Sequence, residues 1–136
     1  MSKFFNISEA ASIGIHSIVL IAKSEGRLNV TKISEIMSFS RHHVAKVMQR
    51  LGKAGLVSST RGPAGGFVLA KNPADINLLH VYEAIEGPIV DTDCPLGYET
   101  CPFNKCLLDS VAGMINKSFK EYLQSHTIEY YLTNGY

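Results

Sequence analysis

Two amphipathic stretches separated by a tight turn constrain the fold of this chain more than any other feature. The longer stretch, residues 41–54, has apolar side chains at i, i+3, i+4 and i+7: Val44, Val47, Met48 and Leu51. This spacing predicts a helix with one buried face, and the opposite face carries His42, Lys46, Gln49 and Lys53. The shorter stretch, residues 31–37, has an apolar stripe of Ile33, Ile36 and Met37. It is followed by Ser38-Phe39-Ser40, where Ser40 is a good N-cap. The pair predicts a helix-turn-helix whose second helix enters the DNA major groove, although many enzymes also contain such helix pairs.

A β-hairpin is predicted directly after this helix pair. Gly55 ends the helix, and the β-like runs 56–60 and 67–70 flank Arg61-Gly62-Pro63-Ala64-Gly65-Gly66. A hairpin at this place turns a helix-turn-helix into a winged helix. Arg61, at the base of the tip, could enter a minor groove, where narrow A·T tracts attract arginine. The alternative is a connecting hairpin with a solvent-exposed arginine.

Three further helices are predicted around this unit. Asn6 and Glu9 resemble a capping box that opens a helix over residues 7–24, with an apolar stripe of Ile7, Ala11, Ile15, Ile18 and Ala22. Residues 77–86 form another helix, with Leu78, Val81, Tyr82 and Ile85 facing inward. The third has an apolar stripe over four turns: Leu108, Val111, Ile115, Phe119 and Tyr122. The tail, residues 125–136, carries no informative pattern.

The last of these stripes is longer than a small domain needs to close its core. We therefore expect it to pair two chains, and the alternative is that it folds back on its own domain. The predicted fold class is mainly α with a small β-hairpin wing: a winged helix-turn-helix domain over residues 1–87, a cysteine-containing loop over 88–106, and a long dimerisation helix with a tail over 107–136. A symmetric homodimer would present its recognition helices to two half-sites about one helical turn apart.

The charge distribution predicts a polyanionic partner. The net charge is only +1, but residues 23–71 carry nine Lys or Arg against Glu25 and Glu35, so the rest of the chain is acidic. Such polarisation is expected to present one basic face, which suits double-stranded DNA. The alternative is a solvated surface charged by chance.

All three cysteines lie within thirteen residues, Cys94, Cys101 and Cys106, at a C-x6-C-x4-C spacing. An odd, clustered set indicates a metal or redox site in a reducing compartment, so we expect a cytoplasmic protein. Thiolates suit iron-sulfur clusters and zinc, and both usually require four ligands. The spacing lacks the C-x2-C pairs of most structural zinc sites, and Pro95 and Pro102 follow cysteines as in some ferredoxins. These features favour iron-sulfur over zinc, with a metal-free thiol sensor as a third interpretation.

The apolar run of residues 11–22 does not predict a membrane segment. Glu9 precedes the run, His16 interrupts it, and it is too short to span a bilayer. We expect a buried helix and no membrane partner. The sequence also lacks a Gly-x-Gly-x-x-Gly motif, a Walker loop and a second cysteine set, so nothing predicts an enzyme or a redox chain.

Residues 40–70 carry a family resemblance, through the pattern Leu-x-x-x-Gly-Leu-Val-Ser-Ser-x-Arg-Gly-Pro-x-Gly-Gly-Phe from Leu51 to Phe67. The chain resembles the bacterial IscR and NsrR family of dimeric winged-helix transcription regulators. The likeness covers nearly the whole length, in the order first helix, helix-turn-helix, wing, cysteine loop and long helix. Many members bind an iron-sulfur cluster through three cysteines placed as they are here, and some lack the cysteines. The resemblance therefore implies a cluster, [2Fe-2S] or [4Fe-4S].

The resemblance also implies which residues contact DNA: Ser40, Arg41 and His42 in the recognition helix, and Arg61 in the wing. The helical wheel adds Lys46 and Gln49. Lysine and arginine would bind phosphates and set the register, while Gln49 or Arg41 could read base edges.

The fourth cluster ligand is where this chain departs from its relatives. Iron-sulfur-assembly regulators supply a histidine shortly after the third cysteine, where this chain offers Asp109. Nitric-oxide-sensing relatives use an aspartate from the partner's first helix, and the aligned Ser12 is a poor ligand. Redox-sensing relatives use a glutamate and a histidine from that helix, and His16 aligns with the histidine. We expect His16, ahead of Asp109 and Glu9, although a histidine in an apolar helix is often a core residue bonded to backbone.

Taken together, the sequence predicts a DNA-binding transcription regulator. Its operator binding would be controlled by the cluster, as a sensor of redox state, nitric oxide or iron-sulfur status. If His16 comes from the partner chain, the cluster would bridge the dimer. The alternatives are a winged-helix protein with a structural zinc or a thiol sensor, and a redox or electron-transfer protein.

Overall fold

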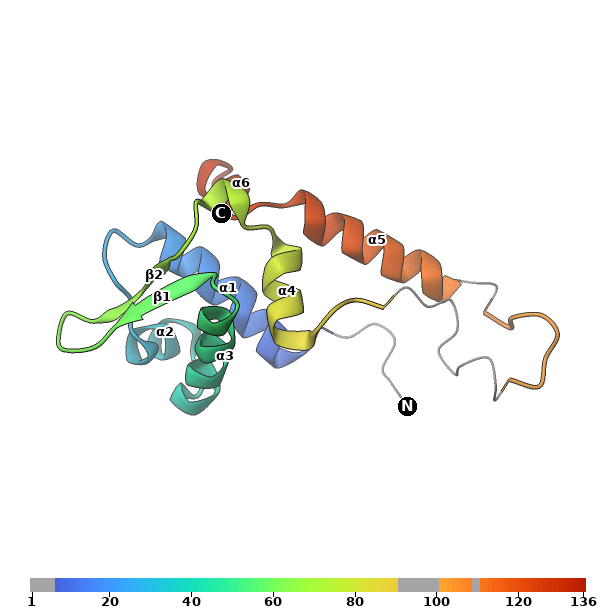
Figure 1. The fold of residues 1–136 in the computed structure, drawn as a ribbon, viewed down its shortest axis with the longest axis horizontal. Helices are drawn as coiled ribbons and strands as arrows, with labels where there is room; N and C mark the ends of the chain where they lie inside the picture. Colours follow the sequence, from blue (N-terminus) through green and yellow to red (C-terminus); the bar gives the residue numbers. More distant parts are fainter. Residues whose placement is uncertain (1–6, 91–100, 109–110) are drawn as a thin grey trace.

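The computed structural model describes residues 7–90, 101–108 and 111–136. Cys94 and Asp109 therefore lie outside the described residues. The elements are α1 (Glu9–Lys23), α2 (Val30–Met37), α3 (Arg41–Lys53), β1 (Val57–Thr60), β2 (Gly66–Leu69), the short 3-10 helix η1 (Pro73–Asp75), α4 (Leu78–Glu86), α5 (Val111–Ser125) and α6 (Ile128–Thr133). Figure 1 shows a body formed by α1–α4, the hairpin and α6, from which α5 extends. The predicted class, mainly helical with a two-stranded hairpin, is confirmed.

The core lies where α1, α3 and α4 pack together. The four apolar residues predicted for α3 are all buried, and its four predicted polar residues are all exposed. Helix α1 approaches its neighbours closely at Gly14. A methyl group there would overlap Cδ1 of Ile85 in α4 and would lie 3.5 Å from a methyl carbon of Val47 in α3. A glycine at this point therefore permits the three-helix packing.

The start of α1 differs from the prediction. Ser8, and not Asn6, is the N-cap: its Oγ accepts a hydrogen bond from the Ala11 amide at 3.0 Å. Ile7 precedes the helix and is exposed, so it does not belong to the buried stripe. In α2, Ile36 was expected to face inward, but half of its surface is exposed. Within the described residues, no helix is both long and apolar enough to cross a membrane.

The wing is a two-stranded antiparallel hairpin, paired from Val57 with Leu69 to Thr60 with Gly66. Its turn is closed by a hydrogen bond from the Gly65 amide to the Gly62 carbonyl at 2.9 Å. Gly66 has φ +148°, and a Cβ there would lie 2.7 Å from the Leu28 carbonyl. This glycine lets β2 lie directly against the loop before α2.

The C-terminal tail forms a helix that the sequence did not predict. α6 packs against α1 and η1, and Ile128 is completely buried. Backbone bonds hold its start in place: the Leu78 amide donates to the His126 carbonyl at 2.9 Å, and the Ile128 amide donates to the Ile76 carbonyl at 2.8 Å. The tail therefore completes the core of this body.

Candidate nucleic-acid interface and cysteine segment

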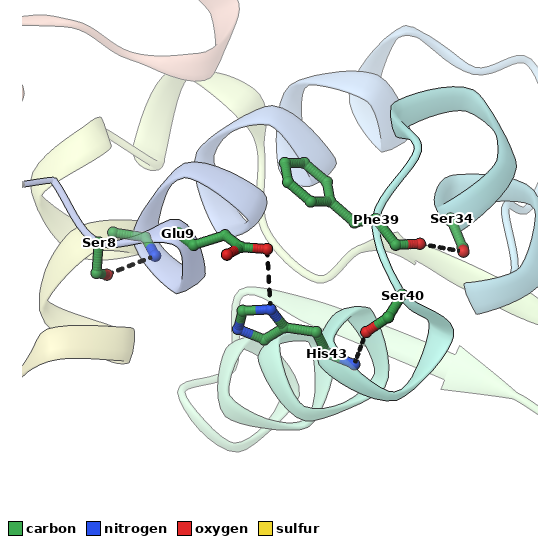
Figure 2. A network of polar contacts seen from close by, with 7 residues as sticks. Ser8, Glu9, Ser34, Phe39, Ser40 and His43 are labelled. Atoms are coloured by element: carbon green, nitrogen blue, oxygen red, sulfur yellow. Dashed lines mark hydrogen bonds and ion pairs between the residues drawn. The ribbon is translucent and has the colours of Figure 1, made fainter.

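Local hydrogen bonds fix the start of the recognition helix α3. Ser38 ends α2 in the left-handed region, with φ 56°, which reverses the chain. The hydroxyl of Ser34 donates to the Phe39 carbonyl, and Ser40 Oγ accepts from the His43 amide at 3.1 Å (Figure 2). The turn between α2 and α3 is therefore held from both sides, which presets the direction in which α3 leaves the body.

The residues expected to contact DNA are all exposed: Ser40, Arg41, His42, Lys46, Gln49 and Arg61. Five of them belong to α3 and its N-cap, and His42, Lys46 and Gln49 share one side of the helix. Arg61 directly follows β1, in the turn of the hairpin that joins β1 and β2. Figure 1 shows this hairpin at the left of the body. One guanidinium nitrogen of Arg41 is 3.4 Å from the Thr31 hydroxyl of α2, a partner that the sequence did not suggest. Lys53 extends the same exposed surface of α3 by one turn.

A second edge of α3 makes contacts within the protein, and sequence reasoning missed it. His43 Nδ1 is 3.4 Å from a carboxylate oxygen of Glu9 in α1, as Figure 2 shows. Farther along the helix, Arg50 Nη1 donates to the Ile85 carbonyl of α4 at 2.9 Å. The only sequence signal for this edge is the seven-residue spacing of the two side chains, which places them on one side of a helix.

Two of the three cysteines can be located. Cys101 is half-buried and Cys106 is exposed. Figure 1 shows residues 101–108 in orange at the far right, beyond the first turn of α5, whereas α1 lies in the body at the left. Across the part of the chain that is described, no three His, Cys, Asp or Glu side chains come together to hold a metal ion. His16 and these cysteines thus do not meet within one chain.

His16 is exposed on α1, and its ring has a defined orientation. Nδ1 is 2.6 Å from the Ser12 carbonyl oxygen. A carbonyl can only accept a hydrogen bond, so Nδ1 carries a proton, and in the neutral ring Nε2 is then the nitrogen with the lone pair. This is the backbone-bonded histidine that the sequence offered as an alternative, but it lies at the surface and not in the core. The other candidate on α1, Glu9, contacts His43 instead.

Helix α5 carries apolar side chains that its own chain does not cover. Val111, Met114 and Tyr122 are 41%, 66% and 54% exposed, whereas Ile115 and Phe119 are half-buried. A shallow hollow of about 430 Å³ is lined by Val111, Met114, Ile115, Ser118 and Phe119. Leu108 of the predicted stripe precedes the helix and is also exposed. Most of the predicted stripe is therefore available to a partner.

Comparison with known proteins identifies the family. The sequence profile of the Rrf2 family, described as an iron-dependent transcriptional regulator, matches residues 7–134. The chain belongs to the Rrf2 family. It is accordingly a DNA-binding transcription regulator and not an enzyme, as the sequence predicted.

The chain is similar in sequence to the transcription regulators NsrR and IscR. The HTH-type transcriptional regulator NsrR of Bacillus subtilis is 34% identical over 78% of this chain and 73% of its own length. The regulator IscR of Pectobacterium atrosepticum is 30% identical over 85% of this chain and 71% of its own. The resemblance to IscR and NsrR proteins is therefore confirmed.

Solved Rrf2 structures have the same fold. CymR, described as the global cysteine regulator of B. subtilis, superposes with a TM-score of 0.76 at 28% identity, covering 93% of this chain and 95% of that one. IscR of T. potens also gives 0.76, at 27% identity, covering 97% and 89%. Because one Rrf2 relative is described as a cysteine regulator, family membership alone does not specify the signal that this chain senses.

Proposed function

We propose that this Rrf2 protein is a homodimeric regulator whose binding to double-stranded operator DNA responds to an iron-sulfur cluster. The ligands would be Cys94, Cys101, Cys106 and His16. The observation that carries the proposal is the hydrogen bond from His16 Nδ1 to the Ser12 carbonyl. Ligating histidines usually donate their second ring N–H in this way, which fixes the tautomer and turns the other nitrogen outward.

The donor chemistry fits such a group. Cysteine thiolates are the common ligands of iron-sulfur clusters, and imidazole nitrogen replaces some of them in Rieske centres. A cluster supplies redox chemistry when bound, with a potential tuned by its ligands and its exposure. His16 is preferred over Glu9 because the carboxylate of Glu9 already contacts His43. Asp109 lies outside the described residues and is the remaining alternative.

The dimer is part of the proposal because, among the described residues, one chain does not bring His16 to Cys101 and Cys106. We assign residues 1–87 to DNA binding, 88–106 to the sensor, and 107–136 chiefly to dimerisation, with α6 packed on the DNA-binding body. The exposed apolar face of α5 supports pairing with a second copy. In that arrangement His16 of the partner chain would complete the site.

For DNA binding, we propose that α3 enters the major groove and that Arg61 of the wing enters the minor groove. Lys46 and Arg41 would contact phosphates, and Gln49 is suited to a bidentate contact with adenine. Ser40 keeps its hydroxyl hydrogen available for a phosphate, because its oxygen only accepts in the helix cap.

Anaerobic purification followed by visible absorption and EPR spectroscopy, with iron and sulfide analysis, tests the cluster. We expect a coloured protein with iron and acid-labile sulfide. Cys101→Ala should be colourless and should bind operator DNA differently. Stoichiometric zinc without sulfide would favour the structural-zinc alternative, and absorbance unchanged by Cys101→Ala would refute the cluster.

His16→Ala should alter the spectrum or stability of the cluster, whereas His42→Ala, at another exposed histidine, should alter neither.

A further inference from the structure

Helix α3 has two polar surfaces with different partners. One surface, which includes His42, Lys46 and Gln49, faces solvent. The other is an edge defined by His43 and Arg50, seven residues or about two turns apart. Both members of this edge contact other helices of the same chain. The edge therefore ties the recognition helix to the body, and we call it the anchoring edge.

Arg50 makes the closer of the two ties. Its Nη1 donates to the Ile85 carbonyl at 2.9 Å in a partly buried contact, while Arg50 as a whole is exposed. Ile85 is in the last turn of α4, where carbonyl groups lack the usual helical donor and where the helix dipole favours a positive charge. The guanidinium therefore satisfies a carbonyl that α4 itself leaves unpaired, and a charged donor makes this hydrogen bond stronger than a neutral one.

The partner of Arg50 is itself fixed firmly. The Ile85 side chain is 6% exposed, and it packs so closely on Gly14 of α1 that the glycine has no room for a methyl group. Val47, on the buried side of α3, also packs against this position, with a methyl carbon 3.5 Å from where a Cβ of residue 14 would lie. Arg50 thus holds the second half of α3 to the point where three helices meet.

The second tie lies at the start of α3. Glu9 of α1 contacts His43 at 3.4 Å, and the side chains are 62% and 34% exposed. Exposed ion pairs contribute little, so this contact is the weaker of the two. The position of this contact matters more than its strength, because it holds the first turn of α3. His43 directly follows His42, and the backbone amide of His43 donates to Ser40 in the N-cap.

From this arrangement we infer that Arg50 is a positioning residue for operator recognition, with the Glu9–His43 pair as a second tie. Arg50 holds α3 on α4 and does not contact a DNA phosphate, although it is a basic residue on the recognition helix. Base contacts need α3 in one fixed orientation, whereas phosphate contacts tolerate displacement. Loss of Arg50 should therefore weaken binding to a preferred sequence more than binding to unrelated DNA. The inference depends on DNA binding, which the family shows, and not on the cluster.

The test compares Arg50→Leu with Lys46→Leu, which remove one positive charge each from the same helix, four residues apart. The DNA probes are a duplex selected by the wild-type protein from a random-sequence pool and a scrambled duplex of the same composition. Fluorescence anisotropy gives the affinity for each at several salt concentrations. Thermal unfolding followed by circular dichroism checks that both variants are folded.

Lys46→Leu should make the negative slope of log affinity against log salt less steep by about 0.9, the value for one lost phosphate contact, and should weaken both duplexes similarly. Arg50→Leu should leave the slope unchanged, weaken the selected duplex about tenfold and leave the scrambled duplex unaffected. A slope reduced as in Lys46→Leu would make Arg50 a phosphate contact and overturn the inference. Equal weakening of both duplexes, or no weakening, would overturn it as well.

Two further variants keep the test decisive if Arg50→Leu folds poorly. Arg50→Lys retains the charge but not the planar donor, so it should keep the salt slope and still lose several-fold in affinity for the selected duplex. Full retention of affinity would overturn the inference.

Glu9→Ala removes a negative charge, which by electrostatics alone should strengthen DNA binding. The positioning role predicts the opposite sign for the selected duplex, a loss of about twofold, and a gain would remove the second tie from the inference.

Discussion

At the scale of single residues, Gly14 shows how one absent side chain determines the packing of three helices. We expect Gly14→Ala to destabilise the fold by about 1–3 kcal/mol, because the added methyl group collides with Cδ1 of Ile85 in a close-packed core. Ile85→Val removes that carbon. Chemical denaturation of both single variants and the double variant measures their coupling.

The two substitutions should compensate each other, so that the double variant is more stable than the sum of the single losses predicts. Gly26→Ala is a matched control, since nothing lies within 4 Å of the position where its methyl group would be. Additive losses would mean that Gly14→Ala acts by some route other than the collision with Ile85.

Residues differ in how far the sequence reveals their roles. Ser40 was predicted as an N-cap because capping depends on a neighbour three residues away. The role of Arg50 was not predicted because its partner is 35 residues distant and is a backbone carbonyl, which every residue has. Its charge alone does not distinguish a contact with solvent or DNA from one with a carbonyl. The predicted cap of α1 was wrong for a local reason. Asn6 and Ser8 are both residue types that favour an N-cap, and they are only two positions apart, so the sequence does not show which of them begins the helix.

Among the elements, α5 carries the clearest exposed apolar face. We expect Met114→Glu to shift the proposed dimer to monomer, because Met114 is 66% exposed and lines the hollow on α5, and a charge there would be buried by pairing. Sedimentation velocity at several concentrations measures the change.

The matched control for this change is Lys117→Glu, at an exposed position one turn along α5 that does not line the hollow. Both variants should retain the wild-type helical content by circular dichroism. A Met114→Glu protein that stays dimeric would move the interface away from this face of α5.

Helix α6 is stabilised by an aromatic cluster that titrates. Burial, and next a hydrogen bond with Tyr122, raise the pKa of Tyr131 well above its usual value. Since the folded pKa exceeds the unfolded value of about 10, this phenol stabilises the fold fully below pH 10, and its contribution is lost as the pH rises through the folded pKa. Unfolding free energy should therefore fall between about pH 9 and 11.

Urea denaturation at the two pH values measures this fall for the wild type and for Tyr131→Phe, which cannot ionise at that position. The fall should be smaller in the variant. An equal fall in both proteins would assign the alkaline sensitivity to other groups, such as Tyr82, whose pKa is also raised by burial.

Elements were predictable where one face is buried over several turns. The apolar spacing of α3 gave its bounds and both of its faces, because its burial follows a single regular period. α6 has only six residues, too few for a period, and its position depends on backbone bonds to residues 76–78. Ile36 of α2 was expected to be buried because helical spacing cannot say how wide the buried stripe of a short helix is.

For the whole molecule, the order of the parts was evident from the sequence, but their separation in space was not. The spacing of the cysteines predicted three ligands, and the family resemblance suggested His16 as the fourth. The structure adds that His16 faces solvent on the body, while residues 101–108 lie beyond the first turn of α5. A site containing both must therefore be formed by two chains, if α5 pairs as proposed.

Subunit mixing tests this arrangement directly. His16→Ala and Cys101→Ala proteins each lack one ligand, so neither homodimer should hold a complete site. If the histidine comes from the partner chain, a mixed dimer contains one intact site, formed by the cysteines of the His16→Ala chain and the histidine of the Cys101→Ala chain. If both ligands come from one chain, every site in the mixed dimer is defective. Purifying the mixed dimer through two different affinity tags and reconstituting it anaerobically should thus restore about half of the wild-type absorbance and sulfide content per dimer. If the mixed dimer regained neither absorbance nor sulfide, the histidine would come from the same chain as the cysteines. A His16→Ala homodimer with wild-type absorbance and sulfide would remove His16 from the site.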